Sequence, residues 1–467
     1  MKALVIAAPM SGAGKTTITL GLMECFKRRG FRVAPFKVGP DFIDPGYHRL
    51  VTGRPSVNLD GWMCSPDYVR HAFQLNAGNA DIAVIEGVMG LFDGIGGRSD
   101  EGSTAQAARL IGAPVVLVVD AKGMARSAGA LVKGFATLDP DVRISGVIFN
   151  NVASEHHGRI LREAVSALVP EVGVLGCIPR DPYLQIPSRH LGLVTADENP
   201  LDKDFLDHLV EVVRKNIDLA MLWRAATPTD LFTTPQQDFS VPAPPPSVRI
   251  AVARDPAFCF AYESNLQLLR EAGAELAAFS PLTEKILPEG IGGIYLPGGY
   301  PELFAEPLAA NKRMKQAIRA AIELGMPVYA ECGGFIYLSR GVVEGDGAGE
   351  EHRFVGVFPV VTRMLSKRKA LGYREIELKA SSLFGGRGLR ARGHEFHYSE
   401  MGEVPPEFRR IYRVSGGRCG VTAEGYSYKN CLASYIHLHF GSNPKMALAF
   451  VGKCRKFAER HRIEKET

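Results

Sequence analysis

The sequence predicts an α/β protein with two domains, and three observations support this prediction. Short apolar runs alternate with helical patterns over residues 1–225, and a second such pattern begins at residue 248. The runs of the first half are β-branched and unbroken, which is typical of parallel strands buried on both faces of a sheet. Residues 226–247 separate the two patterns and are rich in proline. We interpret them as a semi-rigid linker between a domain at 1–225 and a domain at 248–467.

Length and composition fit this organisation. A chain of 467 residues is too long for one ordinary hydrophobic core. It contains 46% hydrophobic and 22% charged residues, and its 55 basic residues exceed the 50 acidic ones by only five. So small an excess indicates no nucleic-acid partner. No apolar run approaches the ~18 residues that suggest a membrane span, so we expect no membrane partner either.

The cysteines indicate a reducing, cytoplasmic location. Eight of them are scattered along the chain without a CxxC pair, which argues against a disulfide scaffold or a structural zinc site. The apolar N-terminus, residues 1–8, runs directly into a glycine-rich loop. We therefore interpret it as a buried first strand and not as a signal peptide.

The first domain has the pattern of a doubly wound parallel sheet. Its expected strands are Ala3–Ala7, Arg32–Phe36, Ile82–Ile85, Val115–Val119, Ile144–Phe149 and Val172–Ile178. Directly after the first of them comes a phosphate-binding loop that opens a helix. The residues that fit this loop are Gly12, Gly14, Lys15, Thr16 and Thr17. Glycines let backbone N–H groups converge on phosphate oxygens, the lysine adds a positive charge, and the next hydroxyl reaches magnesium.

Two features qualify this nucleotide site. Pro9 stands where the strict GxxxxGK pattern has its first glycine, and an ordinary glycine-rich turn is the alternative. Asp41 and Asp44 lie in the loop after the second strand, and Glu86 ends the third strand. Carboxylates at the carboxyl edge of a parallel sheet point into the ligand crevice, where they suit Mg²⁺. Each acid taken alone could instead serve as a turn or cap residue.

The second domain begins as another α/β pattern and continues as alternating strands with glycine turns. Its expected strands are Val248–Val252, Leu276–Phe279, Ile294–Leu296, Pro327–Ala330, Gly372–Leu378, Leu389–His397 and Ser434–Phe440. Residues 444–467 predict a closing amphipathic helix.

Cys332 is the expected nucleophile of this domain. It follows a strand and precedes Gly333 and Gly334, which permit a sharp turn and leave a backbone N–H free for an oxyanion. Gly299 lies in a second glycine loop after another strand and could supply the other N–H group. The alternative is a small buried cysteine in the core.

Histidines near the end of the chain are candidates for the base. His437 and His439 are two residues apart on an expected strand, so both should point to one face. His394 and His397 lack the HExxH spacing of a zinc site. We expect them on a polar strand that binds substrate or serves the structure.

Eight motifs, taken in order, resemble one known family. They are APMSGAGKTT, KVGPDFIDPGYH, IEGVMGLFDG, LPGGYPE, ECGGFIYL, LGYREIEL, GHEFHYS and YIHLHF. The sequence is similar to the cobyrinic acid a,c-diamide synthase family over essentially its whole length. The resemblance implies a deethiobiotin-synthetase-like ATPase domain followed by a class I, triad-type glutamine amidotransferase domain. It also implies amidation of the a- and c-acetate groups of a corrinoid with ATP, Mg²⁺ and glutamine, in cobalamin biosynthesis.

The resemblance implies roles for the residues named above. Thr16 with Asp41, Glu86 or both would hold Mg²⁺, and Asp44 would position the metal or the reacting carboxylate as an acyl phosphate forms. Cys332 would attack glutamine while the Gly299 and Gly333 amides hold the oxyanion, and ammonia would pass to the other domain.

Three positions decide how closely this sequence follows the motifs of the family. Phe42 stands where the family often has tyrosine. The acid of the usual triad would lie at Gly441, so we expect a Cys-His dyad. Tyr435-x-His437 matches the recurring Tyr-x-His of related amidotransferases, which favours His437 over His439 as the base.

Other functions stay open at this point. The same chemistry could act on hydrogenobyrinic acid or nickel sirohydrochlorin. A partitioning-type ATPase switch is a further alternative, but such a switch needs no glutaminase motifs. The sequence also leaves a homodimer open.

Overall fold

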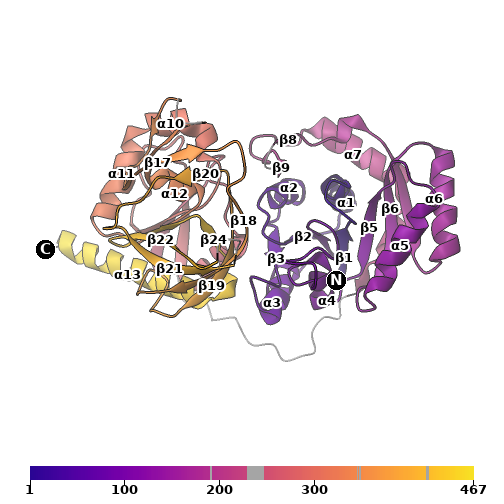
Figure 1. Cartoon of the computed structure of the whole chain (residues 1–467), viewed down its shortest axis with the longest axis horizontal. Helices are drawn as coiled ribbons and strands as arrows, with labels where there is room; N and C mark the ends of the chain where they lie inside the picture. The colour runs from indigo at the N-terminus through magenta and orange to yellow at the C-terminus, as the bar shows by residue number, and fades with distance from the viewer. Residues whose placement is uncertain (190–191, 229–246, 344, 346–348, 417–419, 467) are drawn as a thin grey trace. The chain divides into compact units, whose positions relative to one another are not determined.

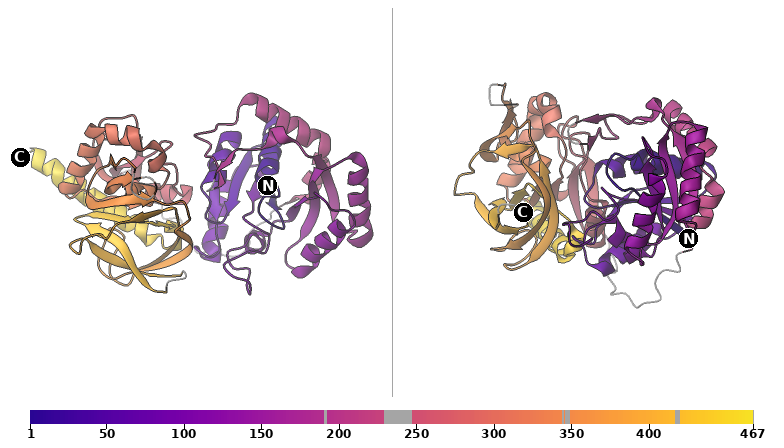
Figure 2. Two further views of the ribbon diagram at one scale, coloured as in Figure 1. Left: turned by 45° about the horizontal axis from the view of Figure 1, so that its top comes forward. Right: turned by 45° about the vertical axis from the view of Figure 1, so that its right-hand side comes forward.

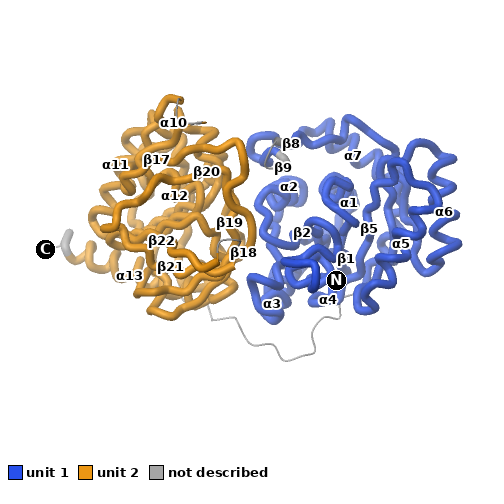
Figure 3. Tube along the Cα trace, viewed as in Figure 1, with its two compact units in different colours: residues 1–237 blue, residues 238–467 orange. Residues whose placement is uncertain are grey.

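The computed structural model describes residues 1–189, 192–228, 247–343, 345, 349–416 and 420–466 (Figure 1). The chain divides into two compact units, Met1–Gln237 and Asp238–Thr467 (Figure 3). Most of the predicted proline-rich linker, residues 229–246, lies outside the described residues. Thr227 and Pro228 form a short strand that pairs with the first strand of the chain.

The first unit is built on a parallel sheet. In the described part of the chain it has eight strands, in the order β3-β2-β4-β1-β5-β6-β7, with the short β10 (Thr227–Pro228) antiparallel to β1. The parallel strands are β1 (Lys2–Ala7), β2 (Val33–Val38), β3 (Val57–Leu59), β4 (Ile82–Glu86), β5 (Val115–Asp120), β6 (Ile144–Val152) and β7 (Gly173–Pro179). The six predicted strands are present within one to three residues of their expected ends. The three-residue β3 was not predicted, because so short a segment shows no periodicity.

Helices connect these strands and bury both faces of the sheet. They are α1 (Lys15–Arg28), α2 (Ile43–Thr52), α3 (Pro66–Ala77), α4 (Thr104–Ile111), α5 (Ser127–Leu138), α6 (Glu155–Leu168), α7 (Lys203–Asn216) and α8 (Leu219–Ala225). Residues of α1, α2 and α7 share one hydrophobic cluster with alternate residues of the strands, such as Leu4 and Val84. The intervening Val5 and Ile85, on the other face, are also fully buried. Burial on both faces explains the unbroken apolar runs of this half.

Smaller elements complete the first unit. A 3₁₀ turn, η1, spans Pro182–Leu184, and β8 (Ser188–Arg189) pairs with β9 (Gly192–Leu193).

The second unit contains a mixed sheet. Over the residues that the structure describes, it has ten strands in the order β12-β11-β13-β14-β23-β22-β21-β18-β19-β24. These are β11 (Val248–Ala253), β12 (Ala274–Phe279), β13 (Ile291–Leu296), β14 (Val328–Glu331), β18 (Ala370–Leu378), β19 (Arg390–His397), β21 (Arg409–Ser415), β22 (Thr422–Tyr428), β23 (Cys431–Ser434) and β24 (Ile436–Leu438). A second sheet has the order β16-β15-β17-β20, formed by β15 (Ser339–Val343), β16 (His352–Arg353), β17 (Phe358–Met364) and β20 (Ser399–Met401).

Helices of the second unit lie beside its sheets (Figure 2). They are α9 (Glu263–Glu271), α10 (Ala305–Ala310), α11 (Lys312–Glu323), α12 (Gly333–Leu338) and α13 (Lys445–Glu466), with 3₁₀ turns η2 (Pro301–Phe304) and η3 (Phe440–Ser442). The predicted closing helix is α13, which contacts β11 and β13. In the described ranges, no helix combines the length and the apolar character needed to cross a membrane.

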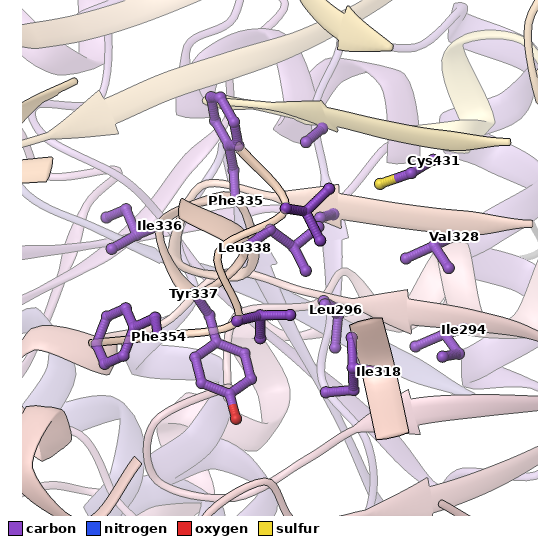
Figure 4. Packing of buried hydrophobic residues seen from close by; sticks show 14 of the residues in the cluster. Ile294, Leu296, Ile318, Val328, Phe335, Ile336, Tyr337, Leu338, Phe354 and Cys431 are labelled. Atoms are coloured by element: carbon purple, nitrogen blue, oxygen red, sulfur yellow. The ribbon is translucent and has the colours of Figure 1, made fainter. Parts of the chain in front are cut away.

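The short helix α12 lies in the core of the second unit. All six of its residues are buried, and Figure 4 shows Phe335, Ile336, Tyr337 and Leu338 among the apolar side chains of β13, β14 and α11. A helix packed on every side holds its first residue firmly in place. Cys332 is the residue that immediately precedes this helix.

One expected strand is wrong. The predicted strand Ser434–Phe440 is divided at Tyr435 into β23, which pairs with β14 and β22, and β24, which pairs with β19. β24 ends at Leu438, so His439 lies beyond the strand, at the start of η3. Period-2 alternation did not reveal this break, because both pieces are extended and buried.

Candidate functional site

The glycine-rich loop of the first unit has the backbone of an anion-binding turn. Gly12 and Gly14 have φ values of 80° and 95°, in the left-handed region, and α1 begins directly afterwards at Lys15. A Cβ atom on Gly14 would lie 2.3 Å from Nδ2 of Asn150, and this amide donates a hydrogen bond to the Ala13 carbonyl at 3.0 Å. The loop therefore requires glycine at position 14 for conformation and for space. Its place before a helix N-terminus suits phosphate.

Lys15 points back over this loop. Its Nζ atom donates hydrogen bonds to the Met89 carbonyl at 2.7 Å and to the Met10 carbonyl at 3.3 Å. Burial and then the neighbouring Lys37 ammonium lower the pKa of Lys15 to about 8. Phosphate oxygens would favour the charged form of this lysine.

Glu86 is the centre of a buried polar network at the end of β4. Its Oε1 atom accepts a hydrogen bond from the Thr16 hydroxyl at 2.7 Å and one from Lys37 Nζ at 3.1 Å. His48 Nε2 lies 2.7 Å from Oε2 of Glu86. Burial opposes the charged form, but Lys37 and the His48 hydrogen bond hold the pKa of Glu86 well below its usual range.

Asp44 and Asp41 lie on the other side of Lys37. Lys37 Nζ donates to Asp44 Oδ2 at 2.5 Å and lies 3.9 Å from Asp41 Oδ2. Burial, together with the Asp41 and Glu86 charges, raises the pKa of Asp44. Asp41 Oδ1 accepts the backbone N–H groups of Ile43 and Asp44, so this side chain also caps the start of α2.

The residues present fit a magnesium ion in part. The ranges that the structure describes contain no cluster of three His, Cys, Asp or Glu side chains arranged to hold a metal by themselves. Thr16 and Glu86 do converge at the phosphate loop, with 2.7 Å between their oxygens. One hydroxyl and one carboxylate are a sufficient protein contribution for Mg²⁺, which takes its other ligands from phosphates and water.

In the second unit Cys332 occupies a strained turn between β14 and α12. Its φ of 43° and ψ of −101° place a non-glycine residue in a region that L-amino acids rarely adopt. A Cβ atom on Gly334 would lie 2.2 Å from the Leu296 carbonyl oxygen, so this position needs glycine. The geometry matches a nucleophile elbow, with the thiol presented at the end of a strand.

The two predicted oxyanion donors lie side by side. A Cβ atom on Gly333 would be 2.8 Å from the backbone nitrogen of Gly299, so the two backbones approach closely. Gly299 itself has a φ of 154° and packs against Ala257, whose carbonyl oxygen would lie 2.1 Å from an added Cβ atom. Side chains at these positions would separate the two loops.

His437 joins this group from β24. It pairs in register with His394 of β19, and the two rings stack with centroids 5.0 Å apart and 18° between their planes. A Cβ atom on Gly298 would lie 2.3 Å from Cε1 of His437, so the ring rests on the loop that carries Gly299. Burial, followed by the charges of His394 and His397, lowers the pKa of His437 well below its usual value.

His439 has a different environment. Its Nδ1 atom accepts a hydrogen bond from the Gly441 backbone at 3.1 Å, and its ring lies 4.7 Å from that of Tyr262. Burial lowers its pKa to about 3. The structure thus brings His437 to the glycine loop and places His439 at the start of the next turn.

The other two histidines are engaged within the protein. His394 Nδ1 lies 2.8 Å from the Tyr262 hydroxyl. His397 bonds to the Ser399 carbonyl at 2.7 Å and to Glu395 at 2.9 Å. These contacts agree with the expected polar strand.

Comparison with known proteins identifies the chain. The family model described as CobQ/CobB/MinD/ParA nucleotide binding domain matches residues 4–194, and the one described as CobB/CobQ-like glutamine amidotransferase domain matches residues 249–445. The cobyrinate a,c-diamide synthase of Syntrophotalea carbinolica is 46% identical over 97% of this chain and 98% of its own length. Those of Priestia megaterium and Listeria innocua are 43% and 41% identical, each over 97% of this chain and over 97% and 99% of their own lengths.

The chain belongs to the cobyrinate a,c-diamide synthase family. This confirms the family resemblance and the fold class that the motifs predicted, a nucleotide-binding domain followed by a glutamine amidotransferase domain. The pairing makes the chain a glutamine-hydrolysing carbon–nitrogen ligase.

Two residues of this family member were missed by the sequence analysis. Lys37 is buried and binds both Asp44 and Glu86 through one ammonium group. It lies in the KVGPDFIDPGYH motif, in an otherwise apolar strand, where a charged residue is itself a signal. Among the predicted acids, Asp44 and Glu86 are thus already paired with a cation.

Glu331 is the second missed residue. It ends β14 directly before Cys332 and is fully buried. Its Oε2 atom lies 3.9 Å from Nδ1 of His437. A charged residue at the end of a buried strand is the signal that the sequence analysis used for Glu86, and it applies equally to Glu331.

Proposed function

We propose that this enzyme amidates the a- and c-acetate carboxylates of cobyrinic acid, with ATP and with glutamine or ammonia, in cobalamin biosynthesis. The observation that carries the proposal is one chain with two centres. A phosphate-binding loop with a buried acid network lies in one unit, and a strained cysteine elbow with a histidine lies in the other. The names of the relatives support the corrinoid substrate.

Activation takes place in the first unit. The glycine-loop amides and Lys15 bind the phosphates of ATP, and Thr16 with Glu86, Asp41 or both would hold Mg²⁺. When bound, the ion neutralises charge on the phosphates during transfer. Asp44, fixed by Lys37 at 2.5 Å, positions the reacting carboxylate. An oxygen of that carboxylate attacks the γ-phosphorus, ADP leaves, and an acyl phosphate forms.

Nitrogen release takes place in the second unit. The Cys332 thiol gives its proton to His437 as its sulfur attacks the side-chain carbonyl of glutamine. The amides of Gly299 and Gly333 hold the oxyanion, and His437 protonates the leaving ammonia, which leaves a thioester. Water then cleaves the thioester, which releases glutamate and restores the thiol.

The resting pKa values support this order of events. Burial, then the Glu302 charge, raise the pKa of Cys332, and burial lowers that of His437. The pair therefore rests as a neutral thiol and a neutral imidazole. Proton transfer must accompany substrate binding, which limits wasteful reaction of the thiol.

Amide formation completes the cycle. Ammonia attacks the acyl phosphate carbon, phosphate leaves with the bonding electrons, and the amide loses a proton.

We place the reaction in the cytoplasm, where thiols stay reduced. We also propose that the enzyme forms a homodimer. Sedimentation velocity, which reports the mass of the particle in solution, tests this.

The experiment compares nitrogen sources and substrates in one assay. Cys332→Ala should abolish glutamine-dependent amidation and retain ammonia-dependent amidation, because the thiol acts only on glutamine. Loss of both in a folded variant contradicts the two-centre proposal. Turnover of cobyrinic acid, hydrogenobyrinic acid and nickel sirohydrochlorin by the wild-type enzyme identifies the tetrapyrrole, and equal or faster turnover of either rival overturns the assignment.

A further inference from the structure

The usual acid of an amidotransferase triad has no counterpart two residues beyond His439, where this chain has Gly441. The structure brings another carboxylate to the histidine. Glu331 ends β14, and its register partner on β23 is Ser434, three residues before His437. Oε2 of Glu331 lies 3.9 Å from Nδ1 of His437, and both side chains are buried, with at most 2% exposed.

Three donors fix the Glu331 carboxylate in position. The Tyr295 hydroxyl donates to Oε2 at 2.9 Å, and the Tyr329 hydroxyl donates to Oε1 at 2.6 Å. The backbone N–H of Leu438 donates to Oε1 at 3.1 Å. Because Leu438 follows His437 on β24, the carboxylate is bonded to the strand that carries the base.

Among the residues that the structure describes, no Lys or Arg side chain pairs with this carboxylate, so it does not belong to an ordinary buried ion pair. Tyrosines and one backbone amide are neutral donors, so they stabilise the carboxylate form less than a cation would. His437 becomes such a cation when it takes the Cys332 proton. Among the contacts of the described residues, His437 is the basic side chain within 4.0 Å of Glu331.

We propose that Glu331 is the positioning carboxylate of His437, so that the glutaminase centre is a Cys332–His437–Glu331 triad whose acid precedes the nucleophile in the chain. This rests on the proposed function of the second unit. Glu331 receives no proton from the substrate. It stabilises the imidazolium that forms when sulfur attacks, and it orients the ring so that Nε2 takes the thiol proton.

One residue therefore serves both catalytic groups. The backbone of Glu331 leads directly into the strained turn of Cys332, and its Oε2 atom lies 3.9 Å from Nδ1 of His437. Movement of β14 would displace nucleophile and acid together, which preserves their relative geometry.

The test uses two substitutions in the full-length enzyme. Glu331→Gln keeps the shape and removes the charge, and Glu331→Asp keeps the charge and shortens the side chain. Glutamate release at saturating glutamine should fall about 10- to 100-fold in Glu331→Gln. This is less than the ~10⁴-fold loss on neutralising the acid of a serine protease triad, because 3.9 Å exceeds hydrogen-bond length.

Two readouts separate positioning from a structural role. A positioning carboxylate lowers kcat and leaves the KM for glutamine unchanged, and Glu331→Asp should retain more activity than Glu331→Gln. A structural role predicts the reverse ranking, because glutamine is isosteric with glutamate. Alkylation of Cys332 by iodoacetamide should also be slower in Glu331→Gln, since thiolate formation depends on a stable imidazolium.

The results for the Glu331 variants can be told apart from a failure of the proposed glutaminase function. Wild-type kcat in folded Glu331→Gln, a change confined to KM, or a less active Glu331→Asp would each overturn the triad. If Cys332→Ala still hydrolysed glutamine, the glutaminase assignment itself would be wrong, whatever the Glu331 variants did. Ammonia-dependent amidation should stay at the wild-type rate in both Glu331 variants.

Discussion

Gly298→Ala should disable glutamine hydrolysis by displacing one ring. A Cβ atom at this position would lie 2.3 Å from Cε1 of His437, whereas ordinary Cβ contacts begin at 3.4 Å. The ring or the loop must therefore move by about 1.1 Å. The backbone of Gly298 is outside the left-handed region, so alanine adds no conformational strain there. A misplacement of ~1 Å in a catalytic group costs about 10²-fold in rate.

The assay measures glutamate release at saturating glutamine and ammonia-dependent amidation in the same preparation. The first should fall about 10²-fold, and the second should be unchanged, because the substitution lies in the second unit. Gly452→Ala, on α13, is the matched control, since an added Cβ atom meets nothing within 4 Å there. A folded Gly298→Ala enzyme with the glutaminase rate of the control would refute the placement of His437 beside this loop.

The remaining predictions concern charges at the two centres. Glu86→Gln should stop amidation with either nitrogen source, because Glu86 binds Thr16, Lys37 and His48; normal ammonia-dependent rates would contradict its role. His437→Ala should reduce glutamate release by about 10²- to 10⁴-fold, and His439→Ala much less, so the opposite ranking would move the base. Lys15, whose pKa is lowered to about 8, is charged below that pH. Phosphate binding needs the charged form, so the Kd for ATP, measured by calorimetry, should rise up to ~10-fold per pH unit above pH 8; a Kd independent of pH would contradict this.

The fold was predictable where periodicity is strong. The strands of the first unit are buried on both faces, so their sequences are continuous apolar runs that identify them directly. β3, with three residues, is too short to give a pattern. The division of the last strand depends on pairing, since β23 lies beside β14 while β24 lies beside β19. Partners distant in sequence decide that break, and local alternation does not record them.

The sequence predicted many residues of the candidate site but not the side-chain contacts between them. Gly14 and Gly299 were recognised from glycine patterns, and the structure gives the physical reason in the space around them. Lys37 was missed because its importance depends on Asp44 and Glu86, which approach it only in the folded unit. Glu331 was not predicted because it precedes Cys332 in the chain, whereas the usual triad acid follows the histidine. With Glu331 as proposed, the expected dyad of Cys332 and His437 becomes a triad.

Glu86 and Glu331 are both buried glutamates, but their pKa values are shifted in opposite directions because their neighbouring side chains differ. Glu86 and Glu331 each end a buried parallel strand, and burial alone would raise the pKa of both. Lys37 and His48 reverse this effect for Glu86, which stays ionised beside the phosphate loop, as the proposed magnesium ligand needs to be.

The donors that the described residues offer Glu331 are neutral, so burial dominates and raises its pKa to about 8. A carboxyl group with a pKa near neutrality responds to the charge of its partner, and an imidazolium at 3.9 Å would favour its ionised form. The form of Glu331 that stabilises His437 after it takes the Cys332 proton is therefore the carboxylate, and the imidazolium in turn stabilises that form. In the described part of the chain, the neutral donors of Glu331 and its nearness to His437 thus make its carboxylate form depend on the charge of the catalytic histidine.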